Sequence, residues 1–306
     1  MMRSDSPPLR FLSLFLSLFL LSPFASETQG QETALYERKD RLAEPSQGTS
    51  EVQWRPEATH PCTILRMTTS EFKQLFPRGL IPLYPHPLVI VADNKERNAY
   101  FRHLTESDRI LEFFPPNFSV TLSSSNSFSE HRRTIPFAQY LDEILATKET
   151  LPGQLSNETW YLFGETYSEE WKKLLNHYQL PECIACTDRD LVALSFGIGN
   201  RGSGVQWHIH GPGFSEAVHG RKHWVLYKDK PEFHKDQTSR NWMEYNYVAM
   251  DPDERPYECT LEPGDLVYFP DMYWHATINL DPFTAFVSTF TQEHLFVNDE
   301  DRQGFR

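Results

Sequence analysis

From Leu191 onward the chain consists of short apolar runs separated by Gly, Pro and Asp turns, and this pattern restricts the fold more than any other feature. The runs are LVALSFGIG, EAVHGRKHWVLYK, YECTLEP, DLVYFP, HATINL and FTAFVSTF. Short β-rich segments at such spacing are typical of sandwiches and barrels. A polar segment around residues 232–247, which we expect to be helical, interrupts the series once. The second half of the chain is therefore predicted to be mainly β.

Helical and extended patterns alternate ahead of these runs. Apolar residues at helical spacing predict helices at 70–76, 100–114, 136–145 and 169–175. Strands are predicted at 62–67, 87–93, 118–124 and 160–165. Thr69 and Ser168 are expected to cap two of the helices. A chain of 306 residues with 39% hydrophobic residues can bury one ordinary core, so we expect a single domain over residues 59–295, mainly β with flanking helices (α+β).

Three histidines in the β-rich half have the spacing of metal ligands. His208 and His210 flank a single Ile, and side chains two residues apart in a strand point to the same face. His275 follows a Gly-Asp turn and a short apolar run. In a barrel, such residues from two strands can occupy one face of a metal ion and leave positions open. The neighbouring Trp207 and Trp274 should point to the opposite face and pack against helices.

The motifs around these histidines resemble the JmjC domain. The sequences FGIG, HGPGFSE and GRKHW are followed by the Gly264-Asp265 turn, Pro270 and Tyr-Trp-His275, as in that family. The resemblance covers about residues 60–295. It implies a double-stranded β-helix, that is, a jelly-roll or cupin-like barrel preceded by helices, which in JmjC proteins hosts Fe(II) and 2-oxoglutarate.

The resemblance also assigns roles to individual residues. It makes His208 the first metal ligand, His275 the distal one, and Lys222 the anchor of the 2-oxoglutarate carboxylate. Ser215 and Val205 stand where hydrogen-bonding partners of 2-oxoglutarate are expected, and the side chain of Val cannot donate a hydrogen bond.

The chain departs from the family at the second ligand. Where JmjC enzymes have Asp or Glu two residues after the first His, this sequence has His210. The 2-His-1-carboxylate set supplies an anionic oxygen and leaves open positions for co-substrate and O₂. A neutral imidazole in that place raises the net charge of the site.

A second pattern is similar to the cupin motifs. Gly202–Glu216 resembles the first motif and Gly264–Asn279 the second, although the gap before Glu216 is one residue longer than usual and Met272 replaces a Gly. This interpretation adds Glu216 to the three histidines as a fourth metal ligand. A carboxylate there could equally pair with Arg221 or Lys222 at the barrel mouth.

The N-terminus has the features of a secretory signal peptide, predicted at residues 1–26. Two Arg residues precede an apolar run at 11–21, and small residues follow Pro23. The run is shorter than the roughly 20 residues that span a bilayer, although an uncleaved anchor remains the alternative. Residues 27–58 are expected to be a disordered acidic leader and 296–306 a charged tail. We expect no membrane span after signal cleavage.

Sequons and cysteines fit the same compartment. Asn117 and Asn157 begin N-glycosylation sequons. The four cysteines, an even number, allow three disulfide pairings in an oxidising space. Among these pairings we favour Cys62 with Cys259, and we favour a structural role for the CIAC sequence over a redox or zinc motif. We expect the protein in the secretory pathway, in the endoplasmic reticulum lumen or else secreted, although the tail carries no KDEL-type signal.

Charge restricts the partners. The net charge is −13 and no basic cluster is present, which argues against nucleic-acid binding. We expect other proteins as partners, and the sequence does not determine the oligomeric state. Three functions remain open: a luminal protein-binding regulator with an atypical metal pocket, an active Fe(II)- and 2-oxoglutarate-dependent protein hydroxylase, and a cupin-like metalloprotein with three His and one Glu. Whether the chain is an enzyme depends on which of these holds.

Overall fold

The computed structural model describes residues 54–80, 84–94, 96–125, 131–147 and 149–291. All of them belong to one compact unit, Ser50–Arg306. The other unit, Met1–Thr49, lies outside the described residues. So do the predicted signal peptide, the leader up to residue 53 and the charged tail. Among the described residues no helix has the length and apolar character needed to cross a membrane.

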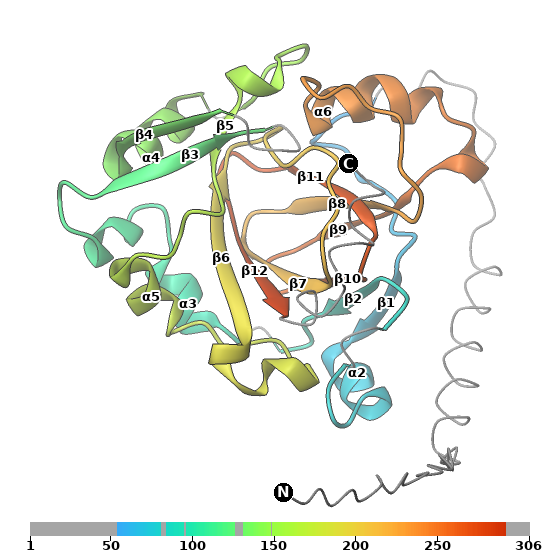
Figure 1. Cartoon of the computed structure of the whole chain (residues 1–306), viewed down its shortest axis with the longest axis horizontal. Coiled ribbons are helices and arrows are strands. Elements are labelled where there is room, and N and C mark those ends of the chain that lie inside the picture. Colours follow the sequence, from blue (N-terminus) through green and yellow to red (C-terminus); the bar gives the residue numbers. More distant parts are fainter. Residues whose placement is uncertain (1–53, 81–83, 95, 126–130, 148, 292–306) are drawn as a thin grey trace, which may run out of the picture. The chain divides into compact units, whose positions relative to one another are not determined.

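Two sheets enclose a common interior (Figure 1). The larger sheet contains, in spatial order, β1 (Leu65–Thr68), β2 (Leu88–Val91), β10 (Leu266–Phe269), β7 (Gly213–His219), β12 (Thr284–Thr291), β6 (Val192–Gly199), β5 (Trp160–Leu162), β3 (Ser119–Ser124) and β4 (Arg132–Pro136). The smaller sheet contains β11 (Trp274–Asn279), β8 (Lys222–Tyr227) and β9 (Tyr257–Leu261). Nearly all of the strands paired in these sheets are antiparallel, and β1 runs parallel to β2.

The chain winds between the two sheets in a way that identifies the barrel. β7 pairs with β10 in the larger sheet, and the next strand of each segment, β8 and β11, pairs in the smaller one. Two segments far apart in sequence therefore coil around each other. This is the double-stranded β-helix that the resemblance to the JmjC domain implied, and the mainly β fold class is confirmed.

Helices cover the outside of both sheets. They are α2 (Thr69–Leu75), α3 (Ala99–Leu104), α4 (Phe137–Thr147), α5 (Glu169–Leu175) and α6 (Ser239–Trp242), which continues into a π-helical turn at Met243–Tyr247. Figure 1 shows α3, α4 and α5 beside the larger sheet, on the side away from the interior. Their apolar faces form one core with β6 and β12. The predicted helical interruption at 232–247 corresponds to α6 and its π-helical turn.

Two predicted helix boundaries were wrong. The cap of α2 is Thr68 rather than Thr69, because Thr68 forms a reciprocal capping box with Glu71. The helix predicted at 100–114 divides into α3 and a short 3₁₀ turn, Ile110–Phe113. The Thr105 hydroxyl donates to the carbonyl of Phe101, and such local bonds compete with helix continuation.

The residues before β1 are attached to the barrel at two points. Trp54 is 4% exposed and packs in the core cluster of the smaller sheet, together with Trp242 of α6. Cys62 forms a disulfide with Cys259 of β9, the pairing favoured from the sequence. A second disulfide joins Cys183 to Cys186, so all four cysteines are paired.

Candidate metal centre

The structure brings the three predicted histidines together. His208 and His210 lie in the segment that follows β6 and runs beside β11. The backbones of His208 and His275 exchange two hydrogen bonds, of 3.0 and 2.9 Å. One ligand atom from each histidine lies within 4.8 Å of the others. Among the described residues, this is the one cluster of at least three His, Cys, Asp or Glu with ligand atoms so close together.

Backbone carbonyls orient all three rings in the same way. Nδ1 of His208 is 2.9 Å from the Gln206 carbonyl oxygen, and Nδ1 of His275 is 2.9 Å from that of Tyr273. Nδ1 of His210 is 2.8 Å from the carbonyl oxygen of Gly211. A carbonyl can only accept, so each Nδ1 carries the hydrogen and each Nε2 of a neutral ring presents a lone pair. Metal-binding histidines are oriented by such bonds.

The resulting arrangement fits a cation. The Nε2 atoms of His210 and His275 are 3.2 Å apart, so two lone pairs face each other. Burial, with the neighbouring charge of His210, lowers the pKa of His208 to about 3. Burial and the charge on His208 lower the pKa of His275 well below its usual value. These two rings are thus neutral near pH 7, and imidazole donors suit zinc, copper, iron or nickel.

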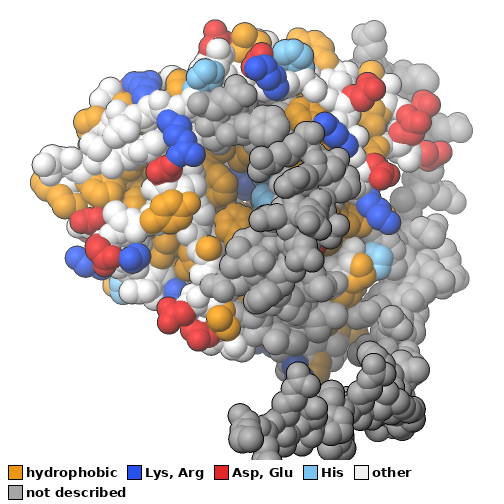
Figure 2. All heavy atoms as spheres, in the orientation of Figure 1, with side chains coloured by type: hydrophobic (Ala, Val, Ile, Leu, Met, Phe, Trp, Pro, Cys, Tyr) orange, Lys and Arg blue, Asp and Glu red, His pale blue; other side chains and the backbone are white. Residues whose placement is uncertain are grey.

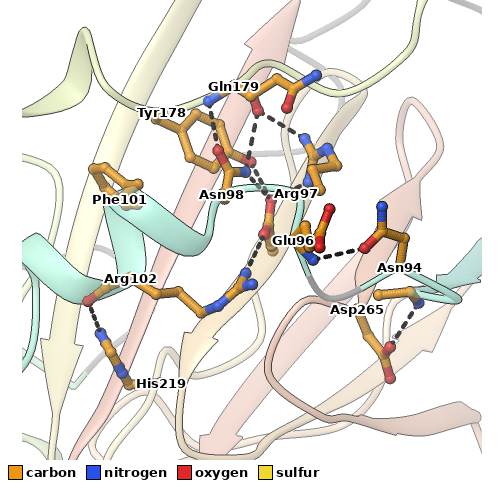
Figure 3. Close-up of polar contacts among 12 residues, drawn as sticks. Asn94, Glu96, Arg97, Asn98, Phe101, Arg102, Tyr178, Gln179, His219 and Asp265 are labelled. Carbon is orange, nitrogen blue, oxygen red and sulfur yellow. Dashed lines mark hydrogen bonds and ion pairs between the residues drawn. The ribbon is translucent and has the colours of Figure 1, made fainter.

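The structure does not place Glu216 at this site, which corrects the prediction of a fourth ligand. Side chains alternate along β7, and Glu216 points out of the barrel. Its Oε2 accepts hydrogen bonds from Arg97, from Asn98 at 2.9 Å and from Tyr178 at 2.9 Å. Arg102 lies 3.8 Å from its other oxygen. Figure 3 shows these four partner side chains converging on one carboxylate. Burial raises the pKa of Glu216, and the charge of Arg97 opposes that effect.

The predicted co-substrate residues already have partners within the protein. Lys222 faces the interior, donates to Oδ1 of Asn279 at 2.9 Å and lies 3.8 Å from the ring centre of Phe286. Burial lowers the pKa of Lys222 to about 7. The Ser215 hydroxyl also faces the interior, where it accepts a hydrogen bond of 3.2 Å from Ser288.

The space between these groups is small. A cavity of about 20 Å³ lies among the histidines and Lys222. Such a volume holds about one water molecule, whereas pockets for small organic ligands typically measure about 300 Å³ or more. The cavity is lined by Phe163, Val205, His208, His210, Lys222, Trp224, Phe269, His275, Thr277, Phe286, Ser288 and Phe290.

Sequence reasoning missed the aromatic lining of this site. His275 stacks on Phe269, with ring centres 5.0 Å apart, and on Trp224 at 5.7 Å. Phe290 meets His210 edge-on at 5.2 Å, and Phe286 lies two residues from Ser288 on the same strand face. Period-two alternation in FTAFVSTF is the signal that could have placed Phe286 and Phe290 inside.

The remaining predicted residues are found at the surface or in the core. Trp207 and Trp274 are 0% and 6% exposed and pack with Trp242, as expected for side chains pointing away from the interior. Asn117 is exposed in the turn before β3. Asn157 is exposed in the short 3₁₀ helix Ser156–Glu158.

Sequence comparisons with known proteins agree with the barrel, and one solved structure is similar to part of the chain. Residues 92–294 match the family model described as a cupin-like domain. The chain is 39% identical over 234 residues to JmjC domain-containing protein 8 of Homo sapiens, covering 75% of this chain and 83% of that protein. Identity to the protein of the same name from Rattus norvegicus is 40% over 236 residues, covering 75% and 82%. Among solved structures, the ribosomal oxygenase YcfD from Escherichia coli, in complex with cobalt and 2-oxoglutarate, is similar with a TM-score of 0.36 and 19% identity, covering 67% of this chain and 48% of that chain.

Proposed function

Since the chain belongs to the JmjC family of cupin-like proteins, we propose that its barrel holds a divalent metal ion on His208, His210 and His275 and that it works mainly as a protein-binding regulator. The observation that carries the proposal is the donor set: three imidazole nitrogens converge, and the carboxylate that the cupin pattern offered, Glu216, points out of the barrel. We therefore expect the protein to bind the metal but to lack efficient oxygenase activity.

The metal would be held by three uncharged ligands. Three imidazoles leave the full +2 charge on the site, whereas a 2-His-1-carboxylate set neutralises one unit of it. A divalent ion supplies Lewis acidity and lowers the pKa of a bound water. The rings of Trp224, Phe269 and Phe290 pack against the histidines, of which His275 is buried while His208 and His210 are partly exposed.

Surface clefts favour a binding role. One cleft of about 360 Å³ lies beside α4 and includes Leu151, which is 66% exposed. Another of about 590 Å³ lies beside α6 and includes Tyr245, which is 62% exposed. Figure 2 shows further hydrophobic side chains gathered on the left half of one face, over elements that Figure 1 draws in green. Exposed apolar groups that cluster in this way mark protein contacts.

The proposed location is the secretory pathway, most simply the endoplasmic reticulum lumen. It is supported by the signal-peptide pattern of residues 1–26, by two exposed sequon asparagines and by two disulfides. Expression of the full chain in mammalian cells tests this proposal. Cleavage of the leader and glycans sensitive to endoglycosidase H are expected, and an unglycosylated chain in the cytosol would contradict it.

Metal content and turnover test the functional proposal together. Protein purified from a eukaryotic secretory host is expected to carry one metal ion per chain by plasma mass spectrometry, and His275→Ala is expected to lose it. His234→Ala is the matched control, because the His234 side chain is 76% exposed and lies outside the cluster. Reconstituted with Fe(II), O₂ and 2-oxoglutarate, the wild type should release little succinate.

The second candidate function is an active protein hydroxylase. The inward, fully buried Lys222 favours it, since that residue matches the anchor of 2-oxoglutarate in the family resemblance. Wild-type succinate release that depends on His208 and Lys222 would establish this function and refute the regulator. His210→Asp restores a carboxylate at the second ligand position. If this variant releases succinate and the wild type does not, the missing carboxylate ligand is the cause of inactivity.

A further inference from the structure

Lys222 lies inside the barrel with an aromatic ring where an anion would be expected. Its ammonium is 3.8 Å from the ring centre of Phe286, and Oδ1 of Asn279 accepts one hydrogen bond. Lys222 is 1% exposed and Phe286 2% exposed. The cavity lining, all of it among the described residues, contains no carboxylate. The ring face, which carries the negative part of the aromatic quadrupole, takes over part of the role of a counter-ion.

The ring of Phe286 is fixed from both sides. β12 pairs with β6 so that Phe286 lies opposite Gly197, and a Cβ at Gly197 would be 2.3 Å from Cζ of the ring. Phe163 packs on the ring, with centres 5.2 Å apart. Only a glycine at position 197 leaves room for the ring against the sheet, and close-packed interiors leave few alternative positions for such a group.

We propose that the ring of Phe286 occupies the position on Lys222 that a ligand carboxylate would take; we call this ring the plug. The metal centre therefore accepts water-sized ligands and excludes 2-oxo acids. This inference rests on the proposed function, because it names the ligand class of that same centre. The space left beside the metal ligands is about 20 Å³, room for one water molecule. The ring of Phe286 fills space and also covers Lys222, the one cationic group in the cavity lining. Anionic chelators are therefore the ligands that the cavity excludes most strongly.

Removing the plug should open this position on Lys222. Phe286→Ala uncovers the ammonium of Lys222, which can then form charge-assisted hydrogen bonds with a carboxylate. We expect 2-oxoglutarate to bind this variant about 100-fold more tightly than the wild type, the effect of one buried charged contact. The gain should disappear in Phe286→Ala/Lys222→Met. Phe290→Ala is the matched control, because it removes an equal ring from the same strand face while Phe286 stays on Lys222.

Isothermal titration calorimetry of the full chain provides the measurement. Mn(II)-loaded protein is titrated with 2-oxoglutarate, and metal-free protein with glutarate, which keeps both carboxylates and lacks the chelating oxo group. Circular dichroism first confirms that each variant is folded. If Phe286→Ala is unfolded, Phe286→Val, which suits a strand, takes its place with the same criteria.

The outcomes separate this inference from the proposed function. Three results would overturn the plug. The wild type could bind 2-oxoglutarate within fivefold of the affinity of the Phe286 variant, Phe290→Ala could gain as much affinity, or the gain could persist in Phe286→Ala/Lys222→Met. If the wild type binds no metal, the proposed metal centre is refuted. The titration of metal-free protein with glutarate still tests the plug in that case. Metal bound by the wild type with no gain in the Phe286 variant refutes the plug alone.

Discussion

The disulfide between Cys62 and Cys259 should contribute far more stability than the one between Cys183 and Cys186. The first joins the segment before β1 to β9, across a sequence separation of 197 residues. The second closes a separation of 3 residues. We consider the replacement of each pair by two alanines, with the other disulfide intact.

Loop closure sets the expected magnitude. In the chain-entropy model, a cross-link restricts the unfolded chain more when its loop is longer. For a separation of 197 residues the model gives about 5 kcal/mol at 25 °C, and for 3 residues about 2 kcal/mol. Domains typically have a free energy of unfolding of about 5–15 kcal/mol. Loss of the long-range disulfide therefore removes at least about a third of that stability.

Urea unfolding followed by circular dichroism and tryptophan fluorescence measures both variants. The free energy of unfolding should fall more for Cys62→Ala/Cys259→Ala than for Cys183→Ala/Cys186→Ala, with coincident transitions by the two probes. Equal losses, or a larger loss from the short-range pair, would show that native-state packing around the sulfurs outweighs chain entropy and would refute the reasoning.

Three further predictions concern single side chains. Glu216→Ala leaves the Arg97 guanidinium without its carboxylate, so urea unfolding should show a loss of about 3 kcal/mol, while metal content stays unchanged; loss of metal would return Glu216 to the ligand set. Met272 has a φ of 57°, so Met272→Gly should raise the free energy of unfolding by up to about 1 kcal/mol, and a decrease would count against strain there. Burial lowers the pKa of His60 from 6.5 to about 4, so the unfolded chain binds the proton more tightly than the folded chain. The free energy of unfolding therefore falls as the pH is lowered from 6.5 to 4. His60→Phe, which keeps the stacking on Trp54, should reduce that loss by at most about 1.4 kcal/mol per pH unit, and an unchanged pH profile would contradict the assignment.

Local periodicity in the sequence predicted a sandwich or barrel and placed two of the histidines on one face. The resemblance to JmjC and cupin motifs added the type of barrel and the third histidine, His275. Short alternating runs specify strands, and residues two apart share a face, so His208 and His210 could be placed together. The same periodicity explains the error at Glu216. The gap before it is one residue longer than in cupins, and a shift of one residue turns a strand side chain to the other face. Ser215 therefore points into the barrel where the cupin motif has its carboxylate.

Contacts between distant strands were beyond such reasoning. The packing of Phe286 on Lys222 depends on the register of β12 against β6 and on the spacing of the two sheets. Neither the strand register nor the sheet spacing can be predicted from the pattern of a single strand. The Met272 position is an intermediate case: its departure from the cupin glycine was visible in the sequence, and the positive φ shows that the backbone there still has the conformation that glycine favours.

The position of β10 between β2 and β7 also determines when the protein can fold during its synthesis. Leu88 of β2 pairs with Tyr268 of β10, so β2 leaves the ribosome long before the strand that covers its edge exists. At roughly 5–20 residues per second, that edge waits on the order of ten seconds or more. Unpaired edges attract other chains during such a delay. A nascent chain that stops before residue 266 cannot close the larger sheet, so this edge of β2 stays unpaired until translation of the domain is almost complete.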